Sequence, residues 1–313
     1  MFNSLRKFMF NSLHNLRKTS PSLIHVNSLE ECDWEAVKKH IKEKMENVKV
    51  IQEPFPHLHV DNIFPDDFYT LLLSQLPNAN LFEDTHPHDS PCMLVPEHSV
   101  FQKLSEPQQV FWRYFDENIS KAVIAKRLHE TFAYSAEQKL SLLFGDKWKE
   151  HVESTELKPL VANSSVGTRG IIHLRLKGCV QEPHTDNITC INTQILYYAK
   201  DAKHKSAGIT LYDVKNVEKL IKSLKEQGQV RVWYMDKEEC DVQPVKRIDY
   251  LPNRLVAFAG LPFAVHSVDK INENFLRYSM QTLSYLPKQL TDPLFKDWDD
   301  PASRTGKFDP NIY

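Results

Sequence analysis

The spacing of apolar residues along the chain changes near residue 157. Before this point apolar side chains recur every three or four residues, as in the series Trp34, Val37, Ile41 and Met45, which is the spacing of one helical face. After it, apolar residues alternate with polar ones or form short runs between turn residues, which is typical of strands. The pattern therefore predicts a helical first part and a β-rich second part.

The first part contains several helices separated by turn-forming residues. Asp33 is suited to cap the first helix, and Pro65, which two aspartates follow, is suited to begin the second. Residues 80–100 are polar and contain several prolines, which predicts a loop. The predicted elements are helices from Asp33, from Pro65, from Ser105 to about His129 and over residues 136–144, with short strands at 48–51 and 57–60.

The second part predicts a barrel of short strands. Many short strands that close on themselves form a jelly roll. One helix interrupts the series, because Val217, Leu220 and Leu224 recur at helical spacing within residues 214–227. The expected fold class is α+β, with a jelly-roll (double-stranded β-helix) core and an N-terminal helical support. The strand-like segments are residues 171–176, 190–198, 209–212, 230–234, 254–258 and 275–286.

This pattern suggests four regions along the chain. We expect a basic leader over residues 1–28, a mainly helical support over 29–156, the jelly roll over 157–290 and a polar tail over 291–313. The leader has no acidic residue, and its apolar residues fall near one helical face. A transit peptide, a membrane-surface helix and a disordered leader, with Met9 as an alternative start, all fit this pattern. The disordered leader is the favoured interpretation.

Composition and charge narrow the class of protein. At 313 residues, 41% of them hydrophobic, the chain is long enough for a sizeable core. Its net charge of −2 shows no basic excess, which argues against a nucleic-acid partner. No run approaches the ~18 apolar residues of a membrane-spanning helix. The 5 cysteines have no short spacings, which argues against a disulfide framework or structural zinc and favours a reducing, cytoplasmic location.

Candidate chemistry gathers at two histidines and a carboxylate. His184 and Asp186 are two residues apart, so on an extended strand both side chains point to the same side. His266 lies at the end of a later predicted strand. Two imidazoles and one carboxylate on one face of a metal ion leave the opposite positions open, as in the facial triad of non-haem Fe(II) oxygenases. These three residues are the predicted metal ligands and catalytic residues.

An arginine and a serine follow the second histidine. Arg277 can form a two-pronged ion pair with a carboxylate, and Ser279 shares its side of the strand. The order His-x-Asp, distal His and Arg-x-Ser, over residues 165–286, resembles the Fe(II)/2-oxoglutarate-dependent dioxygenases, in particular the prolyl-hydroxylase-like branch. Many relatives have two glycines where this chain has Ala207-Gly208, a difference expected to affect a turn and not the chemistry.

The resemblance implies a set of cofactors and a reaction. It implies Fe(II) held by the triad, O2, and 2-oxoglutarate bound through Arg277 and Ser279, with Arg277 on a strand beside that of His266. The resemblance also implies a tyrosine whose hydroxyl points into the barrel and helps to bind 2-oxoglutarate. The family pattern favours Tyr198 over Tyr197 for this role. A carboxylate at 186 favours hydroxylation over halogenation. The expected activity is hydroxylation of an unactivated C–H bond of a small molecule or a protein or peptide side chain, with succinate and CO2 as coproducts.

Alternative interpretations concern both the function and other histidines. A catalytically silent jelly-roll binding protein would need no intact triad, and a cupin-type metalloenzyme would lack the Arg-x-Ser pair. His59-Val60-Asp61 repeats the His-x-Asp pattern ahead of a helix but has no such partner, so it is interpreted as structural. The histidines of His86-Pro87-His88-Asp89 lie in the predicted loop, and we expect no metal there.

Overall fold

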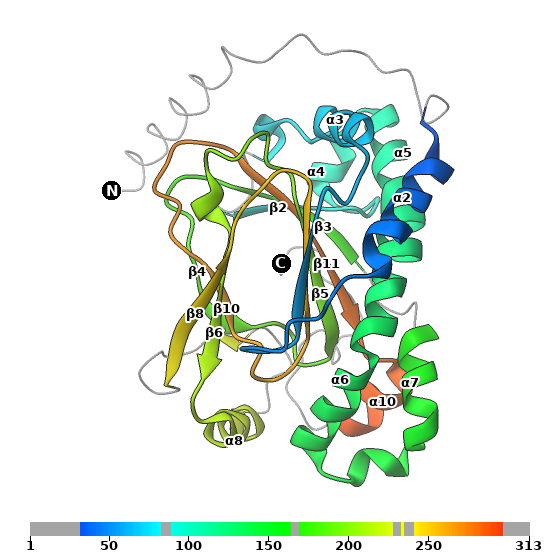
Figure 1. Ribbon diagram of the computed structural model, residues 1–313, viewed down its shortest axis with the longest axis vertical. Coiled ribbons are helices and arrows are strands. Elements are labelled where there is room, and N and C mark those ends of the chain that lie inside the picture. Colours follow the sequence, from blue (N-terminus) through cyan, green and yellow to red (C-terminus); the bar gives the residue numbers. More distant parts are fainter. Residues whose placement is uncertain (1–31, 83–88, 164–168, 228–232, 235–240, 297–313) are drawn as a thin grey trace.

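Two antiparallel sheets face each other in the computed structural model, and a column of helices covers the outer side of one sheet (Figure 1). The structure describes residues 32–82, 89–163, 169–227, 233–234 and 241–296. The predicted leader, and the predicted tail from residue 297 onward, lie outside the described residues. No helix in the described ranges has both the length and the apolar character that crossing a bilayer requires.

The strand order is that of a jelly roll. From β3 to β11 the chain passes repeatedly from one sheet to the other, and each strand pairs antiparallel with its neighbours. This connectivity confirms the predicted α+β fold with a double-stranded β-helix core. The six-stranded sheet has the order β1 (His57–Asp61), β9 (Arg254–Ala259), β5 (Cys190–Tyr197), β11 (Arg277–Tyr285), β3 (Arg169–Arg175) and β2 (Asp89–Met93). The five-stranded sheet has the order β7 (Trp233–Tyr234), β4 (Gln181–Thr185), β10 (His266–Val268), β6 (Ile209–Val214) and β8 (Val242–Ile248).

Helices from the first part of the chain pack on the outer face of the six-stranded sheet (Figure 1). The first begins as predicted, because the Asp33 side chain accepts a hydrogen bond from the backbone N–H of Ala36 at 3.0 Å. Its buried face consists of the predicted apolar series from Trp34 to Met45. The helices here are α2 (Trp34–Glu46), α3 (Asp66–Ser74), α4 (Ser99–Gln102), α5 (Glu106–Phe115), a π-helix (Asp116–Ala125) and α6 (Lys126–Phe144).

The helix predicted to end near His129 continues to Phe144. The segments α5, π-helix and α6 follow one another without a break, so the two helices predicted for this region are one. Buried polar side chains such as Ser135 and Lys139 interrupt the apolar face of this helix, which explains why its sequence pattern weakens in the middle. Gly145, whose φ is 61°, ends the helix in a conformation that favours glycine.

Several elements differ from the sequence-based expectation. The predicted loop at 80–100 contains β2, whose Pro91 is tolerated because β2 is an edge strand. The predicted strand at 48–51 is only an isolated bridge between Ile51 and His57. The interrupting helix is confirmed as α8 (Val217–Gln227). The structure adds the helices α7 (Ser154–Asn163) and α10 (Lys288–Leu294), which the sequence pattern did not predict.

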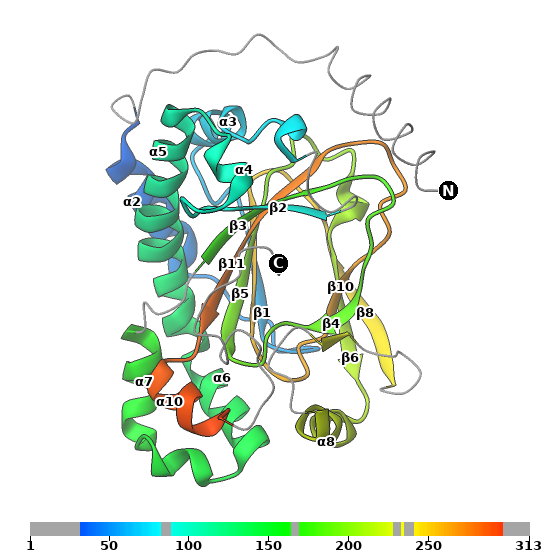
Figure 2. The same ribbon diagram turned by 180° about the vertical axis from the view of Figure 1, so that it is seen from behind.

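The helical region and the barrel share their elements and their core. Strands β1 and β2 come from the region expected to be helical support, and they form the two edges of the six-stranded sheet. One apolar cluster joins this sheet to the first helices, and a second lies where α10 packs beside α6 and α7 (Figure 2). In the second cluster α10 contributes Leu290, which is fully buried. The barrel is therefore supported along its outer face and at one end.

The turn before β6 leaves no space for a side chain at Gly208. A Cβ atom at this position would lie 1.8 Å from the carbonyl oxygen of Ile248 on β8. The preceding residue, Ala207, directs its carbonyl oxygen to the guanidinium of Arg277 at 2.6 Å. The turn was expected to be remote from the chemistry, yet its backbone contacts one of the predicted binding residues.

Gly208→Ala should lower the free energy of unfolding by about 1–3 kcal/mol, because the added methyl group forces β6 and β8 apart. Urea denaturation measures this change. The matched control is Ser206→Ala in the same turn, where the side chain is exposed and the change should stay within about 0.5 kcal/mol. Equal stability of Gly208→Ala and the wild type would contradict the close approach of the two strands.

Candidate metal centre

Antiparallel pairing brings the two predicted histidine ligands together. His184 on β4 lies directly opposite His266 on β10, so the side chains share a face and the ring centroids are 4.3 Å apart. Asp186 follows the end of β4, and its oxygens lie 3.9 Å from His184 Nε2 and 3.8 Å from His266 Nε2. One ligand atom from each residue lies within 4.8 Å of the other two. The structure therefore unites the three predicted ligands in one buried cluster.

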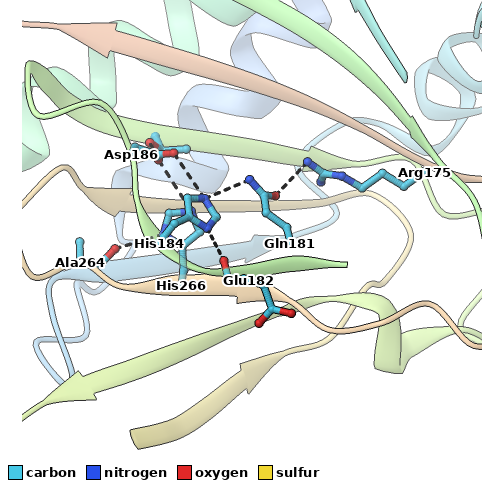
Figure 3. A network of polar contacts seen from close by, with 8 residues as sticks. Arg175, Gln181, Glu182, His184, Asp186, Ala264 and His266 are labelled. Atoms are coloured by element: carbon cyan, nitrogen blue, oxygen red, sulfur yellow. Dashed lines mark hydrogen bonds and ion pairs between the residues drawn. The ribbon is translucent and has the colours of Figure 1, made fainter. Parts of the chain in front are cut away.

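Backbone hydrogen bonds orient both imidazoles toward the carboxylate. The Nδ1 atom of His184 lies 2.8 Å from the carbonyl oxygen of Glu182, and that of His266 lies 3.1 Å from the carbonyl oxygen of Ala264. With the Nδ1–H group donated to a carbonyl, Nε2 keeps its lone pair and faces the cluster (Figure 3). A hydrogen bond from the other ring nitrogen to a backbone carbonyl is usual for histidines that bind a metal ion.

Burial keeps His184 neutral. Desolvation, together with the like charge of His266, lowers the pKa of His184 to about 3. Its side chain is therefore unprotonated at neutral pH, as a metal ligand must be. Thr193 on β5 fixes the third ligand by donating its hydroxyl to Asp186 Oδ2 at 2.5 Å. The donor set of two imidazoles and one carboxylate suits Fe(II) and leaves open positions on the ion.

A polar chain leads away from the cluster through Gln181 (Figure 3). The Gln181 amide nitrogen lies 3.0 Å from His184 Nε2, and its amide oxygen accepts a hydrogen bond from Arg175 Nη2 at 3.0 Å. Since Nε2 has one lone pair, a metal ion bound there would require Gln181 to turn aside. Sequence reasoning did not identify Gln181, which belongs to no motif and reaches the site because β4 bends between Gln181 and His184.

Arg277 is completely buried and lies between aromatic rings. Its Cζ atom is 5.5 Å from the ring centre of Tyr197 and 5.1 Å from that of Tyr250. Its Nε atom donates to the Ala207 carbonyl, and Nη1 donates to the Ser279 hydroxyl at 3.2 Å. Nη2 has no hydrogen-bond partner among the described residues, and no described carboxylate lies within ion-pairing distance. Burial and the charge of Arg175 lower the pKa of Arg277.

Two features of the surroundings of Arg277 stand out: the nearby acids pair with other residues, and the strand of Arg277 lies in an unexpected place. Asp269 and Glu273, the acids available for an internal ion pair, contact Arg247 and His204 instead. Arg277 was expected on a strand beside that of His266, but β11 lies in the opposite sheet, between β5 and β3. Its side chain nevertheless reaches Ala207, next to β6 of the other sheet, and so lies inside the barrel.

Tyr197, and not Tyr198, lies on the side of Arg277. Tyr197 is the cross-strand partner of Ser279, so both side chains point to the barrel interior. Tyr198 points to the helices, where its hydroxyl donates to the sulfur of Met280 at 3.3 Å and its ring packs against Trp112. The expectation for Tyr198 is wrong because the turn between β4 and β5 breaks the alternation of sides that begins at His184.

The remaining histidine motifs do not form a comparable cluster. Asp61 of the second His-x-Asp pattern makes a two-pronged ion pair with Arg254, and His59 is exposed, which agrees with a structural role. Residues 86–88 lie outside the described residues, so their motif stays untested. In the described part of the chain, His184, Asp186 and His266 form the only group of three potential ligands that lie close together.

Comparisons with known proteins gave matches among solved structures only. No protein-family model and no curated protein matches the sequence. A prolyl hydroxylase from Trichoplax adhaerens, in complex with a peptide of the hypoxia-inducible factor, is 10% identical, with a TM-score of 0.44 over 83% of this chain and 96% of that chain. A prolyl-4-hydroxylase from Pseudomonas putida is 9% identical, with a TM-score of 0.41 over 79% of this chain and 99% of that one.

A third similar structure contains a metal ion and 2-oxoglutarate. This protein from Streptomyces hygroscopicus, with nickel and 2-oxoglutarate bound, is 11% identical and has a TM-score of 0.37 over 72% of this chain and 80% of that chain. All three similarities are weak. The function of this chain therefore rests on the residues of its own site.

His184→Ala and His266→Ala should each abolish stoichiometric Fe(II) binding, because each removes one of three ligands. The barrel should remain folded, since neither change alters the backbone pairing of β4 with β10. Iron bound per protein chain under anaerobic conditions measures the first effect, and circular dichroism the second. His59→Ala, an exposed histidine, is the control and should keep full iron occupancy. Wild-type iron content in either site variant would show that the ligands are elsewhere.

Proposed function

We propose that the protein is an Fe(II)- and 2-oxoglutarate-dependent oxygenase that hydroxylates an unactivated C–H bond of a small molecule or a peptide side chain. The observation that carries this proposal is the fully buried Arg277, without a described carboxylate partner, in the same barrel as the His184–Asp186–His266 cluster. A buried guanidinium without a counter-charge is costly. A dicarboxylate that binds the metal at one end and the arginine at the other would explain both features.

The residues present fit both the metal ion and the cosubstrate. His184, Asp186 and His266 would hold Fe(II) on one face. Arg277 Nη2 and the Tyr197 hydroxyl are buried and form no hydrogen bond of ordinary geometry with the described residues, although Tyr197 lies near the backbone of Ile209. Both groups can donate to a carboxylate, and Ser279 Oγ lies beside the same guanidinium.

Each group of the chain then has a distinct role. When bound, Fe(II) and 2-oxoglutarate activate O2 for oxidation of the C–H bond and yield succinate and CO2. The backbone carbonyls of Glu182 and Ala264 hold the two imidazoles in the tautomer that binds a metal. Arg277 and Tyr197 orient the far end of the cosubstrate. Burial raises the pKa of the Tyr197 hydroxyl, so this group stays a hydrogen-bond donor at neutral pH.

Formation of succinate from 2-oxoglutarate tests the proposal. The iron-loaded protein, supplied with 2-oxoglutarate and O2, should release succinate, slowly without substrate and faster when a candidate metabolite or peptide becomes hydroxylated. His184→Ala is the control and should form none above background. If the iron-loaded wild type forms no more succinate than this variant across a broad substrate screen, the protein is a binding module or a metalloenzyme of another kind.

Arg277→Lys should weaken 2-oxoglutarate binding by roughly tenfold or more, because an ammonium group cannot copy a two-pronged guanidinium contact worth ~1.5–3 kcal/mol. Iron binding should change little, since the metal ligands lie elsewhere. Anaerobic titration of the Fe(II) protein, followed by the metal-to-ligand charge-transfer absorption, measures the affinity. Arg247→Lys, on an exposed ion pair with Asp269, is the matched control. If Arg277→Lys keeps the wild-type affinity for 2-oxoglutarate but has a lower melting temperature, Arg277 has a structural role and does not bind the cosubstrate.

Tyr197→Phe should weaken 2-oxoglutarate binding by roughly two- to tenfold, the effect of one lost hydrogen bond of ~0.5–1.5 kcal/mol. Tyr198→Phe is a neighbouring change of the same size, and it should leave the affinity unchanged because its hydroxyl faces Met280 and the helices. The same titration compares the two variants. A loss of affinity in Tyr198→Phe alone would reverse the assignment of these tyrosines.

A further inference from the structure

Lys139 on α6 is a buried cation close to the metal cluster. Its side chain is only 2% exposed, although lysine is rarely buried to this extent without a partner. Its ammonium donates to the carbonyl oxygen of Ile188 at 2.7 Å and also to that of Cys190. No described carboxylate is within ion-pairing distance of it, and Asp186 is the acid whose charge acts on it. Neither the motif nor the roles assigned above make use of this residue.

The Ile188 carbonyl belongs to the short turn that begins with Asp186, and the Cys190 carbonyl belongs to the first residue of β5, directly after this turn. This turn joins β4 to β5, and its middle is fixed by Asn187, whose side-chain oxygen accepts from the backbone N–H and the hydroxyl of Thr189 at 2.9 and 2.7 Å. The ammonium of Lys139 fixes the far end of the turn to the helical layer. Asp186 is thus attached to a turn whose position depends on a charge from α6.

The segment that leads to His266 meets the same turn. The backbone N–H of Gly260 donates to the Ile191 carbonyl at 2.7 Å, and a Cβ atom at Gly260 would lie 2.2 Å from the Cys190 carbonyl oxygen. A small cavity in this place is lined by Lys139, Asp186, Gly260 and Ala264, among others. The segment that carries Asp186, the segment that leads to His266 and the helix α6 therefore all lie next to the ammonium group of Lys139.

We propose that Lys139 is a positioning residue of the metal centre. By binding the carbonyls of the 186–190 turn, its ammonium holds the Asp186 carboxylate at the distance from His184 and His266 that metal binding requires. This inference rests on the proposed metal site and adds a residue from the helical layer to it.

Lys139→Met tests the inference, because methionine is close to lysine in length and fills the space without the charge. The probe is Co(II), titrated into the full-length protein without cosubstrate and followed by its visible absorption. The affinity should fall roughly 10- to 100-fold, as for other residues that position metal ligands, and the absorption bands should shift because the carboxylate moves. If Lys139→Met is not folded, Lys139→Leu, which likewise has no hydrogen-bond donor for the two carbonyls, is titrated instead.

Leu140→Ala is the matched control. This neighbouring residue of α6 is fully buried in the second apolar cluster, so its truncation lowers the melting temperature but removes no hydrogen bond to the two carbonyls. It should keep the wild-type Co(II) affinity and spectrum. If the lysine variants also keep them, or if Leu140→Ala loses as much affinity as they do, the positioning role is refuted. Failure of the wild type to bind Co(II) or Fe(II) would instead overturn the proposed metal function.

Discussion

The pairing of β4 with β10 is the constraint on which the candidate site depends. Because His184 and His266 face each other in this antiparallel pair, two imidazoles from distant parts of the sequence share one face of a sheet. A shift of one residue in the register would turn one of them to the opposite side. The β6 strand pairs with the other flank of β10 and helps to hold this register. The carbonyl contacts of both imidazoles fix the orientation of the rings within their own segments.

The opposite sheet supplies the second half of the site. Arg277 extends from β11 across the barrel to the turn before β6, and Tyr197 lies beside it on β5. One region of the barrel interior therefore has two imidazoles around a carboxylate, and another region has a buried positive charge without a described counter-ion. A dicarboxylate cosubstrate matches this distribution of charge, and its two ends would join the two sheets.

Residues whose roles follow from short motifs could be predicted from the sequence, whereas those set by long-range packing could not. The His-x-Asp spacing predicted that His184 and Asp186 share one side of the chain, and their side chains do lie close together in the structure. The choice of Tyr198 failed because β5 begins after a turn, and only its pairing with β11 shows that Tyr197 faces inward. Lys139 and Gln181 gave no local signal, since their contacts depend on how α6 and β4 meet the rest of the barrel. Likewise, β2 is a strand only because β3 offers it an edge.

The π-helix between α5 and α6 sets the rotational phase of the two α-helices that it joins. Each residue of an α-helix advances the direction of its side chains by about 100°. A deletion of one residue within Asp116–Ala125 would therefore rotate the side chains of α6 about the helix axis, although the segment would remain helical. Lys139 would then leave the turn that carries Asp186, although it lies more than three helical turns further on. The π-helix thus sets the angle between the side chains of α5 and those of α6. The packing of α5 against the sheet and the position of Lys139 near Asp186 therefore depend on each other.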